Sequence, residues 1–272
     1  MWNFAYLDTL ALQPLRHARL FATGSGEGPS LLFVHGGFYG AWCWAPFLEF
    51  FRENGIGCGA VDLRGHGGQT QGDDFPKHGI AEMAEDVHDS AAAMGGNIVL
   101  VGHSAGALTA LRAASAIKPA GLILISPAAP ANVDFKRAPL PEFASDHAIA
   151  VPSDERIRKW FLQGIPGNTD IATIASRLCP ESPAFMNDCF ARGVAFERAL
   201  VACPTFCLSG GRDQSPLHAR GQDQAVAAFL SAEIETIPDA GHSLMIEPLW
   251  RAGAVAILGW LRRTGIVPIK LA

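Results

Sequence analysis

Short apolar runs alternate along the chain with longer segments in which apolar residues recur at helical spacing. Most of the runs are apolar throughout, which is typical of strands covered on both faces, as in a parallel sheet flanked by helices. The predicted strands cover residues 31–35, 58–62, 97–102, 121–126, 205–210 and 232–238, with an edge strand at 19–24. The helices predicted around them cover residues 44–54, 80–94, 105–117, 216–230 and 247–262. This alternation predicts an α/β fold in which the carboxyl ends of the parallel strands share one edge of the sheet.

The alternation stops between about residues 127 and 200, where proline is frequent and no strand signal is seen. The helical pieces predicted there lie at about 153–163, 169–178 and 183–198. Because a structureless loop of this length is uncommon in a compact domain, we expect residues 127–200 to form a helical cap inserted after the sixth strand. Residues 1–126 and 201–272 are then expected to form the core.

Composition and charge narrow the classes of function. The 272 residues are 49% hydrophobic and 17% charged, which is enough apolar material for a sizeable core and unlike a disordered chain. The net charge of −5 contains no block of like charge, so neither nucleic acid nor a membrane surface is an expected partner. No apolar run approaches the roughly 18 residues that span a bilayer, and the amino terminus lacks a basic leader. We therefore expect a cytoplasmic protein.

The six cysteines match no zinc-binding spacing and are typical of small core residues in a reducing compartment. Their spacing leaves open whether Cys179 and Cys189 form a disulfide. The sequence also contains no metal-binding or nucleotide-binding motif, so we expect no metal and no cofactor.

The sequence GHSAG, residues 102–106, joins an apolar run to a helical segment. In a G-x-S-x-G sequence at such a junction, a sharp turn projects the serine hydroxyl above the sheet, and the flanking glycines avoid clashes. The amino terminus of the following helix also offers N–H groups to negative charge. Ser104 is therefore a candidate nucleophile. The alternative is a glycine-rich turn between a strand and a helix, without catalytic function.

A serine hydroxyl needs a base that is oriented by an acid, and in this type of fold the chain order is serine, acid, histidine. Asp213 follows the run at 205–210, and His242 follows the run at 232–238. Both side chains are therefore predicted at the same sheet edge as Ser104. The alternatives are that Asp213 only caps a helix and that His242 only occupies a turn. Asp239 is a rival for the acid, but it precedes His242 too closely to face it easily.

The tetrahedral intermediate of acyl transfer needs preorganised N–H donors for its oxyanion. One candidate donor is the N–H of Ala105, which follows the nucleophile directly. The other is the N–H of Gly37, in the loop after the run at 31–35. We expect His35 to brace this loop, and His66 to belong to a structural turn rather than to act in catalysis.

Several motifs stand in the order and spacing of one family, namely HGGFYGAWCW, DLRGHGG, VGHSAG, SGGRD and DAGHS. On these motifs, which extend from about residue 29 to 262, the chain resembles the α/β-hydrolase superfamily. HGGFYGAWCW and HSLMIEP in particular resemble the branch that contains plant methyl-ester esterases and hydroxynitrile lyases. The resemblance implies an eight-stranded, mostly parallel sheet, a cap after strand six, and a catalytic triad without cofactor. Carried over by position, the triad and the oxyanion donors would be Ser104, Asp213, His242, Gly37 and Ala105.

Within this family, the residues favour ester hydrolysis. Epoxide hydrolases and haloalkane dehalogenases use an aspartate where this chain has Ser104. Hydroxynitrile lyases carry threonine after the first histidine and lysine after the triad histidine, where this chain has Gly36 and Ser243. The predicted function is a serine-dependent hydrolase of small to medium, fairly apolar carboxylic esters that works through an acyl-enzyme. The alternatives are a lactone or carbon–carbon bond hydrolase with the same triad, and a ligand receptor built on a hydrolase fold.

Aromatic side chains of the cap and of the loop after residue 35 are expected to form an apolar pocket over Ser104. Their alternative role is to pack the cap. The pocket candidates are Phe38, Trp42, Trp160, Phe161, Phe185 and Phe190. The expected partner is a small-molecule ester or lactone, and the sequence does not distinguish a monomer from a homodimer.

Overall fold

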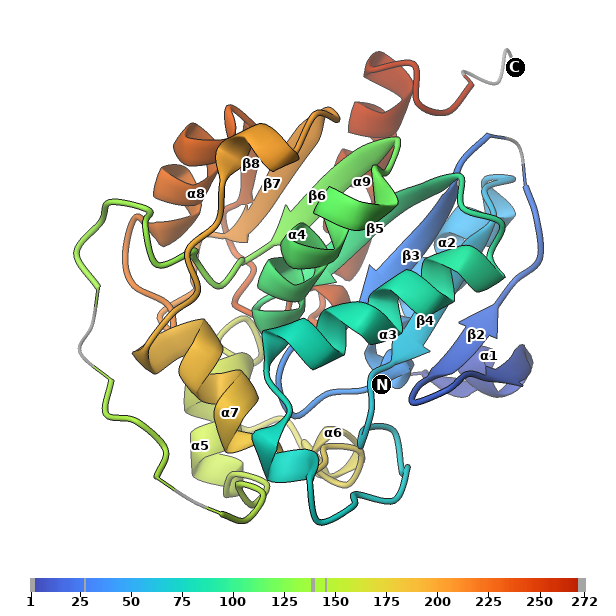
Figure 1. The fold of residues 1–272 in the computed structure, drawn as a ribbon. Coiled ribbons are helices and arrows are strands. Elements are labelled where there is room, and N and C mark those ends of the chain that lie inside the picture. Colours follow the sequence, from blue (N-terminus) through green and yellow to red (C-terminus); the bar gives the residue numbers. More distant parts are fainter. Residues whose placement is uncertain (1–2, 27, 138–139, 145, 269–272) are drawn as a thin grey trace.

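The structure is a computed structural model that describes residues 3–26, 28–137, 140–144 and 146–268. One mixed sheet forms the centre of this part of the chain. Its eight strands lie in the order β1-β2-β4-β3-β5-β6-β7-β8 (Figure 1). Their bounds are Ala11–Pro14 (β1), Arg19–Ala22 (β2), Ser30–Val34 (β3), Cys58–Asp62 (β4), Ile98–His103 (β5), Gly121–Ile125 (β6), Thr205–Gly210 (β7) and Glu233–Ile237 (β8). β2 pairs antiparallel with β1 and β4, whereas β3 to β8 pair in parallel with one another. The parallel strands therefore end at one edge of the sheet.

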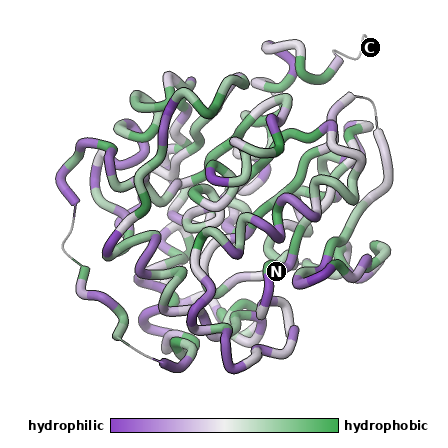
Figure 2. The backbone as a smooth tube through the Cα atoms, viewed as in Figure 1, coloured by the Kyte–Doolittle hydropathy of each residue, from purple (hydrophilic) through white to green (hydrophobic). Residues whose placement is uncertain are grey.

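Helices cover both faces of the sheet (Figure 1). Outside the segment between β6 and β7 they are α1 (Ala5–Asp8), α2 (Ala45–Glu53), α3 (Ile80–Ala93), α4 (Ala105–Ile117), α8 (Gln222–Leu230) and α9 (Trp250–Arg263). α2 and α9 pack on one face, where Phe33 of β3 shares a hydrophobic cluster with Trp260. α3, α4 and α8 pack on the other, where Val34 clusters with Val226. Because both faces are covered, the central strands are apolar along their length (Figure 2), which explains the unbroken runs in the sequence.

The six segments predicted as parallel strands are confirmed, as β3 to β8. The strand predicted at 19–24 also exists, as β2, but it is not the edge of the sheet. β1 lies outside it, with Ala11 opposite Ala22. All four residues of β1 are exposed and the last is Pro14, so this strand carries neither an apolar run nor an alternating pattern. The sequence pattern therefore missed it.

Between β6 and β7, the described residues form short helices and add no strand to the sheet. These helices are α5 (Asp154–Phe161), α6 (Ala172–Ala175) and α7 (Pro183–Met186). α7 runs directly into a π-helical turn at Asn187–Ala191. All of them gather at one end of the sheet (Figure 1).

Three predicted helices are shorter than their patterns indicated. The helix predicted at 169–178 is reduced to α6. After α6 the chain turns toward the loop at Phe38, where the Cys179 N–H donates to the Phe38 carbonyl at 3.0 Å. The helix predicted at 183–198 ends before Gly193, which has a φ of +72°. The helix predicted at 216–230 begins only at Gln222.

All six cysteines are free thiols, so Cys179 and Cys189 do not form a disulfide. None of the helices in the described part of the chain is both long enough and apolar enough to cross a bilayer.

Candidate active site

Ser104 occupies the sharp turn between β5 and α4. Its φ of 53° and ψ of −121° lie in a region that residues with side chains rarely adopt. The turn is fixed because the Ser104 N–H donates to the Ile125 carbonyl at 2.9 Å. It also needs its glycines, since a Cβ added to Gly106 would lie 2.1 Å from the His35 carbonyl oxygen. The GHSAG sequence therefore forms the predicted elbow, with the Ser104 side chain above the sheet edge.

Ser104, His242 and Asp213 form one continuous hydrogen-bonded line. His242 Nε2 lies 3.0 Å from Ser104 Oγ, and His242 Nδ1 lies 2.6 Å from Asp213 Oδ2. Because Nδ1 faces a carboxylate, it carries the proton, and Nε2 is left as the acceptor for the serine hydroxyl. The residues follow β5, β8 and β7, so the sheet brings Ser104 together with two side chains that lie more than a hundred positions further along the sequence.

Asp213 is ionised in this setting. Burial raises the pKa of its carboxyl, but the charge and hydrogen bond of His242 outweigh this and lower the pKa to about 2. The Ser215 N–H also donates to Asp213, at 3.0 Å. Asp239, the rival, instead pairs with Arg212 at 2.6 Å on the surface. The structure thus places Asp213, and not Asp239, against His242.

A second histidine–carboxylate pair, which the sequence reasoning missed, adjoins the first. His218 Nε2 lies 3.0 Å from Asp223 Oδ1 and 3.8 Å from Asp213 Oδ2, and all three side chains are buried. Burial lowers the pKa of His218, but Asp223 and Asp213 raise it by more, so the net shift is upward. The sequence signal was weak, because His218 and Asp223 both fall inside the helix predicted at 216–230, where no motif marks them.

The donor atoms of Asp213, His218 and His242 lie within 4.8 Å of one another, which is close enough for a metal. His242 Nδ1, however, is already protonated toward Asp213, so its lone pair is not free for a metal ion. The geometry is that of a hydrogen-bonded serine–histidine–aspartate line rather than of a ligand set.

Three elements hold the backbone of His242. The Gln163 side chain accepts the His242 N–H at 3.1 Å, and His103 Nε2 donates to the His242 carbonyl at 2.9 Å. Burial lowers the pKa of His103 well below its usual range, so this ring is neutral. Glu247 accepts the N–H of Gly241. Gln163 and His103 thus hold the backbone of His242 itself, and Glu247 holds the backbone of the preceding residue.

The two predicted oxyanion donors both lie beside Ser104. Ala105 is the first residue of α4, where backbone N–H groups lack partners within the helix. Gly37 lines the same cavity as Ser104. The loop that carries it runs against the nucleophile, since a Cβ added to Gly36 would lie 3.1 Å from Ser104 Cβ.

A small cavity adjoins Ser104 and His242. Its apolar lining is Phe38, Tyr39, Phe161, Met186, Phe190 and Leu217. Three of the six predicted pocket aromatics, Phe38, Phe161 and Phe190, are therefore present. α5 contributes Phe161 and the π-helical turn contributes Phe190, so the segment between β6 and β7 supplies part of the wall.

The other three predicted pocket aromatics do not line this cavity. Trp42 packs edge-on against Phe4, with ring centroids 4.9 Å apart. Phe185 is fully buried in the core on the α3 and α4 side. Trp160 lines a separate surface depression with Phe143. Adjacent helical residues point about 100° apart, so helical spacing placed these rings in the right segment without giving their direction.

A parallel sheet that presents a strand–helix serine, a histidine and an aspartate at its carboxyl edge defines the class of hydrolases built on this architecture. The sequence agrees: the chain belongs to the α/β hydrolase family, whose family model matches residues 31–254.

Comparisons with individual proteins are consistent with this family. Over 103 residues the chain is 39% identical to protein phosphatase methylesterase 1 of Bos taurus and 38% identical to the same protein of Homo sapiens. These matches span 36% of this chain and only 26% of the length of those relatives.

Solved structures share the fold at low identity. A bacterial membrane phospholipase A superposes with a TM-score of 0.73 at 18% identity, covering 97% of this chain and 87% of the other. A methylesterase from Arabidopsis gives 0.65 at 16% identity, covering 86% and 98%. The monoacylglycerol lipase of Paleococcus ferrophilus gives 0.65 at 18% identity, covering 93% and 98%. At these identities the likeness establishes the α/β-hydrolase fold, as predicted.

Proposed function

We propose that the protein is a serine-dependent hydrolase of carboxylic esters. The observation that carries this proposal is the hydrogen-bonded line from Asp213 through His242 to Ser104, with Ser104 facing an apolar cavity. Each member has the protonation that nucleophilic catalysis needs: an ionised acid, a histidine with a free Nε2, and a serine hydroxyl that donates to it.

In the proposed mechanism, Ser104 Oγ attacks the ester carbonyl while His242 Nε2 takes the hydroxyl proton. The N–H groups of Gly37 and Ala105 stabilise the oxyanion of the tetrahedral intermediate. His242 then protonates the leaving alcohol, and the acyl-enzyme remains on Ser104. A water molecule, deprotonated by His242, releases the acid and restores the serine. Asp213 keeps the imidazole in the required tautomer and stabilises its positive charge.

The lining of the cavity supports an apolar substrate. The segment between β6 and β7 contributes Phe161, Met186 and Phe190 to this lining, which favours apolar acyl and alcohol groups over charged ones. The proteins named as methylesterases support a small leaving alcohol, because a methyl ester releases methanol.

The test combines labelling with turnover. We expect a fluorophosphonate probe to label wild-type protein but not Ser104→Ala, and p-nitrophenyl acetate to be hydrolysed by wild type only. Ser115→Ala, a serine of α4 whose hydroxyl bonds to the Arg112 carbonyl, is the matched control and should keep wild-type activity. Ser104→Ala should lose on the order of 10³–10⁶-fold in kcat. Labelling of Ser104 without turnover of any short ester would contradict the proposal and favour a ligand receptor.

A further inference from the structure

The loop that carries Gly37 is braced by His35. His35 Nδ1 lies 2.8 Å from the Gly36 carbonyl, and its Nε2 accepts the Leu63 N–H at 3.2 Å. Since a carbonyl only accepts, Nδ1 carries the proton, and the ring is a neutral imidazole with both nitrogens satisfied. The Gly36 carbonyl and the Gly37 N–H belong to one peptide group. His35 therefore orients the peptide whose N–H is the proposed oxyanion donor.

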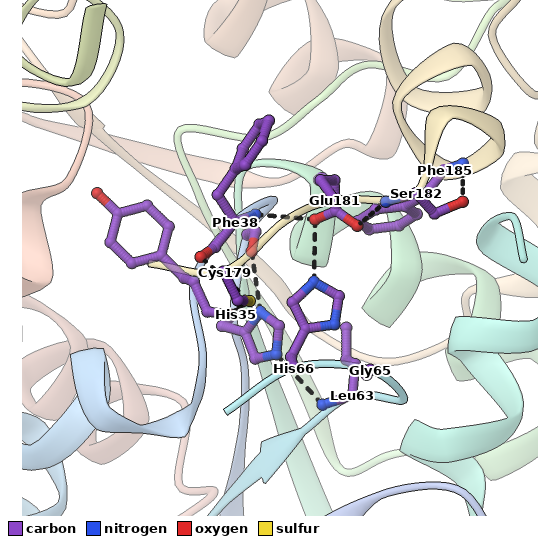
Figure 3. A network of polar contacts seen from close by, with 12 residues as sticks. His35, Phe38, Leu63, Gly65, His66, Cys179, Glu181, Ser182 and Phe185 are labelled. Atoms are coloured by element: carbon purple, nitrogen blue, oxygen red, sulfur yellow. Dashed lines mark hydrogen bonds and ion pairs between the residues drawn. The ribbon is translucent and has the colours of Figure 1, made fainter. Parts of the chain in front are cut away.

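The next two peptide groups are held from the segment between β6 and β7. The Phe38 N–H donates to Glu181 Oε2 at 2.8 Å, and the Cys179 N–H donates to the Phe38 carbonyl at 3.0 Å (Figure 3). Phe38 has a φ of +67°, which is unfavourable for a residue with a side chain. Both bonds therefore maintain a conformation that the loop would not prefer by itself. Gly37 lies between the first two of the three braced peptides.

Glu181 is fully buried and carries three hydrogen bonds. Besides Phe38, it accepts the Ser182 N–H at Oε1 (2.7 Å), and His66 Nε2 lies 3.0 Å from Oε2. His66 Nδ1 lies 2.9 Å from the Arg64 carbonyl, so it must donate there. One proton then lies between His66 Nε2 and Glu181. The other hydrogen bonds of Glu181 come from backbone N–H groups, so with this proton shared the pair carries no net charge.

The neutral pairing has a consequence for the oxyanion. A Cβ added to Gly37 would lie 3.4 Å from Glu181 Oε2, so the carboxylate is close to the loop that faces the intermediate. An unpaired negative charge there would oppose the developing oxyanion. Burial lowers the pKa of His66, but the charge and hydrogen bonds of Glu181 raise it by more. The imidazolium of His66 thus screens the carboxylate that the loop requires.

We propose that Glu181, paired with His66, is a positioning residue that holds the Gly37 N–H in place for the oxyanion. This role rests on the proposed ester hydrolysis, and Glu181 itself touches neither Ser104 nor substrate. It acts through the Gly37–Phe38 peptide. The segment between β6 and β7 thereby contributes to catalysis as well as to the wall of the cavity.

The test uses two replacements of Glu181. Glu181→Gln keeps the shape but has one acceptor oxygen, so either the Ser182 N–H or the Phe38 N–H loses its partner; Glu181→Ala removes both bonds. We expect kcat for p-nitrophenyl acetate to fall about 10²–10³-fold, as when one oxyanion donor is removed, while KM changes less than about threefold. Inhibition by a trifluoromethyl ketone, whose serine adduct carries the oxyanion, should weaken in parallel with kcat.

The matched control is Asp86→Asn. Asp86 of α3 is also a buried carboxylate that accepts a backbone N–H and pairs with a cation, both from Arg64. Unfolding by urea is measured for every variant, and the control should lose stability but keep kcat. If both Glu181 variants fail to fold, His66→Asn tests the same link by leaving Glu181 unscreened, and it should also weaken trifluoromethyl ketone binding.

Three results would overturn the positioning role. The first is a folded Glu181 variant, or a folded His66→Asn protein, with kcat within threefold of wild type. The second is a loss of kcat without weaker trifluoromethyl ketone inhibition, and the third is an equal loss of kcat in Asp86→Asn, because either would reflect general destabilisation. Wild-type protein that hydrolyses no ester would instead overturn the proposed function, and the positioning role with it.

Discussion

Replacing Asp213 by asparagine should reverse the direction in which His242 can move a proton. Oδ1 of Asp213 accepts the Ser215 N–H at 3.0 Å, and Oδ2 accepts the proton of His242 Nδ1 at 2.6 Å. The single oxygen of an asparagine amide is held by the Ser215 N–H, so its NH₂ group faces Nδ1 and donates to it. His242 then carries its proton on Nε2, where it cannot accept the proton of Ser104.

Two effects set the size of the loss. In the wild type the pKa of Asp213 is about 2 instead of 3.8, despite burial, because of the charge and hydrogen bond of His242. At about 1.4 kcal/mol per pKa unit, this means that the surroundings stabilise the carboxylate by roughly 2–3 kcal/mol. Loss of this charge beside His242 and the wrong tautomer of His242 should together lower kcat by about 10⁴-fold, the size known for serine proteases.

The assay compares Asp213→Asn with Asp239→Asn on p-nitrophenyl acetate, with urea unfolding measured in parallel. Asp239 pairs with Arg212, and both side chains are more than half exposed. A surface pair of this kind contributes little, so Asp239→Asn should stay within about twofold of wild-type kcat. A folded Asp213→Asn protein within tenfold of wild type, or a larger loss in Asp239→Asn, would refute the assignment.

Three further predictions follow from the same geometry. Because the folded pKa of Asp213 lies below its unfolded value of 3.8, its stabilising contribution is present above about pH 4 and is lost as the pH falls toward 2. Between pH 5 and pH 2, the free energy of unfolding measured with urea should therefore fall by roughly 2–3 kcal/mol more in wild type than in Asp213→Asn. An equal fall in the two proteins would contradict this. Phe161→Ala and Phe190→Ala should change the ratio of kcat/KM between long-chain and short-chain esters by up to about 10–200-fold. Phe185→Ala should instead lower the free energy of unfolding by roughly 3–5 kcal/mol and leave this ratio unchanged. If all three variants kept the same ratio, Phe161 and Phe190 would not determine substrate chain length. Gly106→Ala should lower the thermal midpoint and the activity together, since its Cβ would lie 2.1 Å from the His35 carbonyl; a wild-type midpoint would show that the turn can relax.

The sequence was most informative where burial is complete. β3 to β6 are covered on both faces, so their runs are apolar without interruption and their positions could be predicted closely. β1 gave no such signal, because its exposed residues gain their order only by pairing with β2. Helix ends between β6 and β7 were also unpredictable, since Cys179 bonds to Phe38, which is far away in the sequence.

The same distinction applies to the site. Ser104, Asp213 and His242 each follow a strand directly, so the sheet alone determines that they meet, and local motifs were sufficient to find them. Glu181 was missed because its partners, Phe38 and His66, lie 143 and 115 residues away and no local pattern marks it. The directions of Trp160 and Phe185 depend on the rotation of α5 and α7, which residue spacing does not define, and the direction of Trp42 depends on its packing against Phe4.

The hydrogen bonds of Glu181 also limit the exchange of the segment between β6 and β7 between family members. A chimera that took this segment from a relative without an equivalent carboxylate would leave the Phe38 N–H without its acceptor and the buried His66 imidazolium without its counterion. Burying such groups unpaired costs several kcal/mol. A successful exchange must therefore move the loops at 35–38 and 62–67 together with the segment. In recombination and in enzyme engineering alike, this segment and the two loops to which it is hydrogen-bonded have to be exchanged as one unit.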